Sequence, residues 1–261
     1  MNNTGKQRID EVAKHYSLIE RLEIISTILF WINSFLSCLI LYSSSFIGKS
    51  GTNIIQSFFL VLVLIYFSIS QVSSLCLVPK AELMRRKQLL SDSLGVPLSI
   101  EHTSLYYNNS FSPSMERLGA NTMENALFSQ EVASKMLYRK RIVIFGYIVL
   151  WLFAVLFRPD NFELLTIITQ LVFSSEIISG WLKLEILRYH FERIYEDLHH
   201  YFLGRSEKES PSANAIILDA FASYESAKST AGILLSTKEF QVLNPTLSKQ
   251  WERTRQKLNI K

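Results

Sequence analysis

Two long stretches without a charged residue constrain the fold of this chain more than any other feature. There are 25 uncharged residues between Glu23 and Lys49, and 30 between Lys49 and Lys80. A helix needs roughly 20 apolar residues to cross the hydrocarbon core of a bilayer. We therefore predict membrane helices near residues 23–44 and 54–78. The charged share of the whole chain, 19 %, is also below the roughly 25 % typical of soluble proteins.

Two further apolar stretches predict a second pair of membrane helices. The first is the 16-residue run between Arg141 and Arg158, whose flanking basic side chains extend it by reaching toward the headgroups. The second covers residues 162–182, which follow after a short loop and include Glu163 and Glu176. We expect an all-α membrane protein with four transmembrane helices arranged as two hairpins.

Lys and Arg flank these helices unevenly, and their distribution predicts the topology. The four membrane-proximal segments outside the hairpin loops hold 4, 4, 4 and 3 of them, whereas each hairpin loop holds 1. The positive-inside rule then places both termini and the central segment in the cytoplasm. The polar N-terminus and the length of the first apolar stretch exclude a cleaved signal peptide. We expect four parts: 1–79 with the first hairpin, 80–139 as the central segment, 140–203 as the second hairpin with a long cytoplasmic extension, and 204–261 as a helical tail.

The central segment is predicted to hold two helices separated by an irregular stretch. Residues 81–93 contain good helix formers, and Gly95 ends this run. A second helical pattern begins at Met115 and leads directly into the third membrane helix, although Gly119 weakens its first turn. This arrangement makes the stretch between the two helices the most distinctive soluble feature of the chain.

The C-terminal part is also predicted to be helical. The pattern of the fourth membrane helix continues to about residue 203, and a further helix is expected over 213–229. The last helix is expected to begin at Asn244–Pro245, because Asn is a good N-cap and Pro suits the first helical position.

A search for catalytic motifs favours a protein that is not an enzyme and has no cofactor or metal. The chain has no P-loop, GxGxxG, HExxH, CxxC or GxSxG motif. Glu196 and His200 are four residues apart and could share a metal, so a membrane enzyme remains an alternative; we expect a solvated helix instead. Cys38 and Cys76 fall at different membrane depths, so both are expected to be free thiols.

Polar residues within the predicted membrane helices have two interpretations. Asn33 and Ser37 lie near one stripe of the first helix, Gln71 lies in the inner half of the second, and Glu176 interrupts the fourth. The side chains of the first two helices either form interhelical hydrogen bonds or face a bundle interior that can become water-filled. Glu176 is either a snorkelling or protonated side chain near the inner interface, or it lines a permeation path or gate. In each case both readings stay open at this point.

The irregular stretch of the central segment contains the sequence SLYYNNS. Asn108 and Asn109 favour a chain reversal, and Tyr106 and Tyr107 combine apolar area with a polar tip. The segment is either a turn that docks on neighbouring helices or a site that holds a ligand or relays a signal. For a ligand, the tyrosines would stack on bases. The basic side chains that would meet phosphates are Arg85, Arg86, Arg139 and Lys140.

The order of these features resembles a known family. Two membrane helices are followed by HTSLYYNN, then by MENALFSQEVASKM before the third, and the tail ends in PTLSKQWERTR. This arrangement is similar to the SMODS-associated four-transmembrane effectors of bacterial conflict systems. The resemblance is carried by Tyr106–Asn109, Glu124, Asn125 and Phe128, and by Pro245, Trp251 and Arg253 in the tail.

The resemblance implies an effector in anti-phage defence, located in the bacterial inner membrane. It implies that a cyclic oligonucleotide from a neighbouring nucleotidyltransferase, or a partner protein, triggers a homo-oligomer. The oligomer then forms pores in the membrane or depolarises it, and the infected cell dies by abortive infection. Direct DNA binding is not expected. The alternative is a membrane anchor or scaffold that recruits a cytoplasmic partner and has no pore activity.

Overall fold

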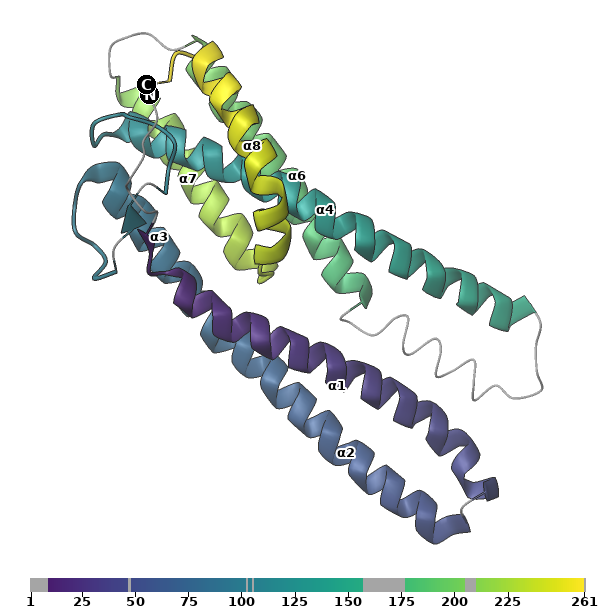
Figure 1. Cartoon of the computed structure of the whole chain (residues 1–261). Helices are drawn as coiled ribbons and strands as arrows, with labels where there is room; N and C mark the ends of the chain where they lie inside the picture. The colour runs from purple at the N-terminus through teal and green to yellow at the C-terminus, as the bar shows by residue number, and fades with distance from the viewer. Residues whose placement is uncertain are drawn as a thin grey trace. The chain divides into compact units, whose positions relative to one another are not determined.

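The computed structural model describes residues 9–46, 48–101, 103–104, 106–156, 177–204 and 210–260. The chain divides into two compact units, and each is described by itself (Figure 1). The core unit comprises Met1–Ala13, Lys80–Arg141 and Gly180–Lys261. The apolar unit comprises Lys14–Pro79 and Ile142–Ser179.

Two helical stretches are long and apolar enough to cross a membrane, and most of the length of each lies in the apolar unit. They are Ala13–Ile40, within helix α1 (Ala13–Phe46), and Gly48–Leu94. The second joins α2 (Gly48–Val72), the π-helix η1 (Ser73–Leu77) and α3 (Val78–Leu94). In the most apolar part of each stretch, only 0 % and 6 % of the residues are buried, and Phe35 is 64 % exposed and Ile54 71 % exposed. Helices in the core of a soluble protein would bury such side chains, so the pattern suits a bilayer.

The second predicted hairpin is only partly described. Its first helix corresponds to the end of α4 (Met115–Leu156), where Phe145, Phe153 and Leu156 are exposed. Residues 157–176, with most of the fourth predicted membrane helix, lie outside the described residues. The described residues therefore include two spans that meet the length and hydropathy requirement, rather than four.

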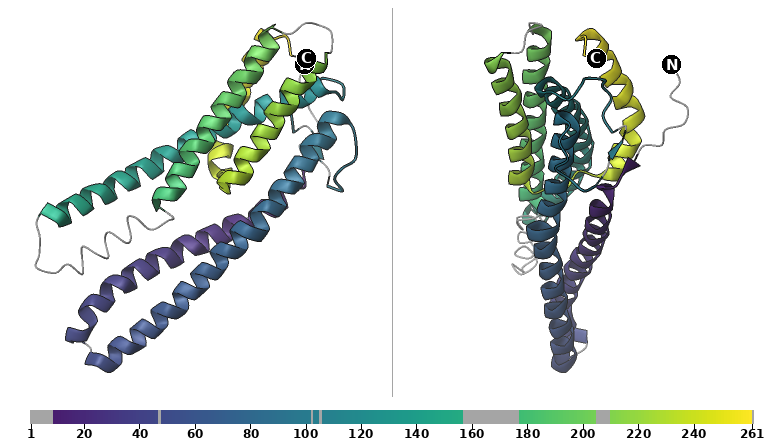
Figure 2. Two further views of the ribbon diagram at one scale, coloured as in Figure 1. Left: turned by 180° about the vertical axis from the view of Figure 1, so that it is seen from behind. Right: turned by 90° about the vertical axis from the view of Figure 1, so that its left-hand side faces the viewer.

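The core unit is an assembly of helices around the first part of α4. Its other helices lie beside this part of α4 (Figure 2). Apolar side chains such as Leu187, Phe191 and Trp251 are buried in one cluster with Met123, Leu127 and Leu137 of α4. The predicted continuation of helical structure to about residue 203 agrees with α6, which ends at Gly204. The helices that lie around the first part of α4 are α3, α6 (Ile177–Gly204), α7 (Pro211–Ala231) and α8 (Thr237–Lys257).

Local signals explain where several of these helices begin and end. Gly95 follows α3 with φ +68°, and its N–H donates to the carbonyl of Ser91 at 3.0 Å. This left-handed conformation favours Gly and ends the helix as predicted. The side chain of Ser210 caps α7 by accepting from the Ala213 N–H, and Gly232 closes its C-terminus in the left-handed region.

The predicted start of the last helix at Asn244–Pro245 is wrong. Helix α8 begins at Thr237, and Pro245 lies inside it. Ser236 accepts a hydrogen bond from the N–H of Glu239 at 3.3 Å, which is a stronger local start signal than the Asn–Pro pair. Arg139 of α4 then pairs with the buried Glu239 carboxylate at 2.5 Å, so this start is fixed against α4.

A short strand pair is the exception to the helical fold. Strands β1 (Ile9–Asp10) and β2 (Thr103–Ser104) pair antiparallel, with Ile9 opposite Ser104. Asp10 also accepts two hydrogen bonds from Arg85 on α3, both at 3.0 Å. These contacts hold the N-terminal segment of the core unit beside the central segment.

Candidate functional site

One face of α4 presents three polar side chains to residues 106–109, which we call the YYNN segment. Asn121, Glu124 and Asn125 are three and four residues apart, so a helix places them on the same side. Asn121 is fully buried and Glu124 is 4 % exposed. Buried groups of this kind need hydrogen-bond partners, and the segment 106–109 supplies several of them.

Glu124 binds Asn108 twice. One carboxylate oxygen accepts from the Asn108 backbone N–H at 3.1 Å, and the other accepts from the Asn108 side-chain amide at 2.5 Å. The indole N–H of Trp251 on α8 approaches the Asn108 carbonyl oxygen at 3.4 Å. Asn108 is therefore held by α4 through its amides and contacted by the C-terminal helix.

Asn109 is connected to α3 through Asn121. Its side-chain amide donates to the Asn121 oxygen at 2.6 Å. The Asn121 amide in turn donates to the Asp92 carboxylate at 3.1 Å and to the Ser93 hydroxyl at 2.9 Å. The same Asp92 carboxylate binds the Arg117 guanidinium, with both oxygens at 2.9 Å from one nitrogen. This chain of bonds joins the YYNN segment, α4 and α3.

The two tyrosines occupy the other side of the segment. Tyr107 accepts a hydrogen bond from the Asn125 amide at 3.1 Å. Burial raises the pKa of Tyr107 well above its ordinary value, and the adjacent Tyr106 raises it further, so the phenol stays neutral. Tyr106 packs edge-on against Tyr107 at 4.9 Å between ring centroids, and the Arg85 guanidinium lies 4.7 Å from the Tyr106 ring centre.

These contacts define what we call the α4 junction, and they bring together seven of the eight residues predicted for ligand binding or signal relay. Five further members were not predicted as site residues: Asp92, Ser93, Arg117, Asn121 and Trp251. The spacing of Asn121 to Glu124 and Asn125 is a local signal that could have identified it. The seven are Arg85, Tyr106, Tyr107, Asn108, Asn109, Glu124 and Asn125.

Arg86 belongs to a different group, which lies between α3, α4 and α7 and is centred on Tyr224. The Tyr224 hydroxyl lies 3.0 Å from that of Ser129, and burial raises the pKa of Tyr224 to about 12. Lys228 pairs with Glu82 of α3 and lies 3.7 Å from Glu225. Burial raises the pKa of Glu225, while Lys228 and, more weakly, Arg86 lower it.

The predicted membrane-path residues are placed as follows. Asn33 is 9 % exposed, and its side-chain oxygen has no hydrogen-bond partner among the described residues. Ser37 and Gln71 are half-buried. Glu176 lies outside the described residues. Asn33 is thus a buried polar group in the apolar part of α1, and within the described part of the chain its side-chain oxygen lacks the partner that an interhelical hydrogen bond would supply.

The region around 190–200 has little of the geometry of a metal site. Glu196 and His200 are both exposed, and Asp197 pairs with Arg193 at 3.9 Å. Across the part of the chain that the structure describes, no three His, Cys, Asp or Glu side chains gather closely enough to hold a metal ion. Within the same part, Cys38 and Cys76 are free thiols.

Comparison of the chain with protein-family models, with curated proteins and with solved structures finds no match. The geometry of the junction and the apolar helices therefore carries the functional argument.

Proposed function

We propose that the chain is an inner-membrane effector of bacterial anti-phage defence that makes the membrane permeable when the α4 junction receives a signal. One observation carries the proposal: the helices that hold the junction are continuous with apolar helical segments. Asn121, Glu124 and Asn125 stand on α4, which runs on through residues 142–156. Asp92 stands at the end of the continuous stretch Gly48–Leu94.

In this proposal the junction acts as a relay rather than as an open pocket. The amides of Asn108, Asn109 and Asn121 already donate to side chains of the junction. A ligand or partner that bound the YYNN segment would compete for these bonds. Rearranged bonds would then shift α3 and α4, because both helices anchor the segment.

The proposed response occurs among the apolar helices. A buried polar group such as Asn33 is unfavourable in a dry bundle, and water entering between helices would satisfy it. Oligomerisation of the chain would surround such a path, since the apolar helices of one copy are too few to enclose a pore. The π-helix η1 supports a change of state, because π-turns within helices often mark functional positions.

A membrane scaffold without pore activity is the second candidate. The internal hydrogen bonds of the junction favour it, because they also suit a rigid module that presents α8 to a partner. This candidate predicts tight partner binding and an unchanged membrane permeability.

Dye leakage from vesicles that contain the purified full chain separates the two. A panel of cyclic di- and trinucleotides would be added, with linear dinucleotides as controls. Leakage caused by one cyclic nucleotide supports the effector and identifies its trigger. No leakage with any member, from inserted and folded protein, argues against nucleotide gating and favours the scaffold.

A further inference from the structure

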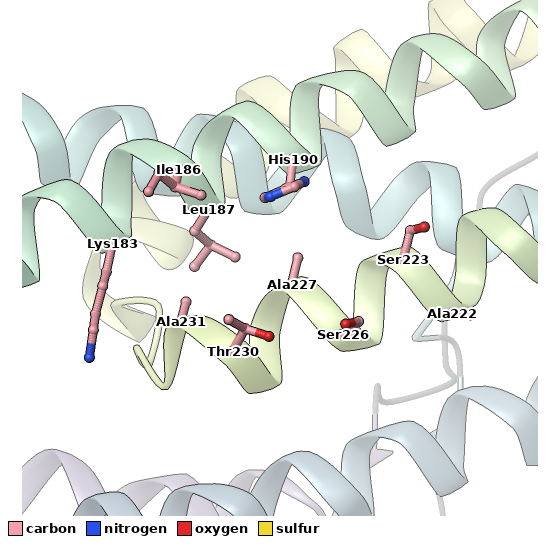
Figure 3. A pocket seen from close by; sticks show the side chains of 10 residues that line it. All are labelled: Lys183, Ile186, Leu187, His190, Ala222, Ser223, Ser226, Ala227, Thr230 and Ala231. Atoms are coloured by element: carbon pink, nitrogen blue, oxygen red, sulfur yellow. The ribbon is translucent and has the colours of Figure 1, made fainter.

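Helices α6 and α7 run antiparallel and line an open cavity of about 510 Å³ within the core unit (Figure 3). Lys183 and His190 lie toward its two ends on α6, with Ile186 and Leu187 between them. Opposite them, α7 presents only small side chains, among them Ser226, Ala227 and Thr230. The short side chains of α7 are what leave the space between the two helices open.

The lining combines an apolar wall with a cation. Ile186 is 56 % exposed although it borders the cavity, and Leu187 forms its floor. Lys183 is exposed, and within the described ranges no carboxylate pairs with it. By contrast, the nearby Arg141 is paired with Glu185 at 2.6 Å. An apolar cavity that ends at an unneutralised ammonium group suits an amphiphile with an anionic head.

The position of Lys183 suggests where this amphiphile comes from. Lys183 lies three residues after Gly180, the residue at which α6 enters the core unit. The residues before Gly180 belong to the fourth apolar stretch of the sequence. Lys140 of α4 also approaches this end of α6. Its Nζ lies 3.3 Å from the position that a Cβ atom would occupy if Gly180 were replaced by a larger residue. Basic residues next to a membrane helix attract anionic lipid headgroups.

We propose that this cavity binds one anionic phospholipid, with its phosphate at Lys183 and part of an acyl chain along Leu187 and Ala227. The hydroxyl of Thr230, which lies between Lys183 and Ala227, faces the glycerol region. The proposal rests on the membrane setting of the chain and not on its effector activity. It therefore survives if the effector proposal fails.

The test uses the full chain in lipid nanodiscs and a phosphatidylglycerol that carries a photoactivatable group in its acyl chain. Cross-linked peptides would be mapped by mass spectrometry, against a matched phosphatidylcholine probe. We expect cross-links on α6 and α7 near Leu187 and Ala227, favouring phosphatidylglycerol. Lys183→Gln should reduce them about fivefold, since one basic residue at a membrane surface contributes about that factor. Lys183→Arg should retain them.

Two controls make the result specific. Lys249→Gln removes an exposed cation of α8 and should leave the cross-links unchanged. Ala227→Leu narrows the cavity without changing charge and should also reduce them, provided that the thermal unfolding of the variant matches that of the wild type.

Three results would overturn the proposal. The first is equal labelling by the two lipids together with no effect of Lys183→Gln. The second is displacement of the probe by free glycerol phosphate, which would indicate a site for soluble anions. The third is cross-linking of these residues only to a second copy of the chain, which would make the cavity a protein interface.

Discussion

Glu124 shows how the α4 junction depends on individual residues. Its carboxylate is 4 % exposed and accepts from both the backbone and the side chain of Asn108. A buried carboxylate is unfavourable unless donors surround it, so the two Asn108 donors stabilise the buried Glu124 carboxylate. The same reasoning applies to Asn121, whose fully buried amide has two acceptors.

Replacing Glu124 by Ala should destabilise the core unit. The two Asn108 donors would lose their acceptor, and leaving buried polar groups unsatisfied costs about 1–3 kcal/mol. Glu124→Gln keeps one oxygen acceptor and should cost less. Chemical denaturation of the full chain in detergent, followed by circular dichroism, measures both. Glu196→Ala, on the exposed face of α6, is the control and should have little effect; equal losses in Glu124→Ala and Glu196→Ala would refute this role.

Because of Glu225, the free energy of unfolding should fall as the pH rises, which is the opposite of the usual effect of a carboxyl group. Burial raises its pKa above the ordinary value of 4.5, against the opposing effects of Lys228 and Arg86 and with the added effect of Glu82. The folded state therefore holds the proton at a higher pH than the unfolded state does. The contribution of Glu225 to stability is fully present below about pH 4.5 and is lost as the pH rises through its raised pKa.

Glu225→Gln should remove this pH dependence. The difference in melting temperature, wild type minus variant, should fall as the pH rises from 4.5, the ordinary value, through the raised pKa of Glu225. Lys228 keeps Glu82 as its partner in the variant. A difference that stays constant or rises over this range would show that burial does not raise the Glu225 pKa.

At the scale of the elements, Gly119 sets how closely α4 and α7 approach. A Cβ at this position would lie 3.1 Å from the Ile217 side chain and 3.4 Å from that of Phe202. Gly therefore has a packing role here that outweighs its low helix propensity. The sequence shows Gly119 only as a weak point in the first turns of α4.

Gly119→Leu should force α7 away from α4 and destabilise the core unit by about 1–3 kcal/mol, the usual range for overpacking. Gly204→Leu is a matched control, because a Cβ there meets nothing within 4 Å. Denaturant unfolding of the two variants gives the comparison. If Gly119→Leu is as stable as Gly204→Leu, the contact with Ile217 does not limit the packing.

The sequence predicts the helices better than it predicts the contacts between them. Charge-free length identifies α1 and α2, and Gly95 marks the end of α3, because these signals are local. The start of α8 at Thr237 was missed because Asn244–Pro245 is also a valid local signal, and only packing against α4 decides between them. The partners Asp92 and Arg117 could not be predicted, since their pairing joins residues that are 25 positions apart.

At the scale of the whole molecule, the proposed relay depends on helix continuity. The junction residues stand on α4 and on the stretch Gly48–Leu94, and both helices include apolar residues that are exposed in the isolated chain. A change in the hydrogen bonds of Asn108 would reach these apolar residues along the helices. This coupling requires an intact Glu124–Asn108 pair but no direct contact between a ligand and the membrane helices.

The most direct test of this central claim is leakage from vesicles that contain either the wild-type chain or Glu124→Gln, at the same protein density. The trigger is the one identified with the nucleotide panel, and Glu196→Ala is the control. We predict that Glu124→Gln remains folded and inserted but loses triggered leakage, while Glu196→Ala leaks as the wild type does. Triggered leakage from Glu124→Gln at the wild-type rate would contradict a relay through the α4 junction.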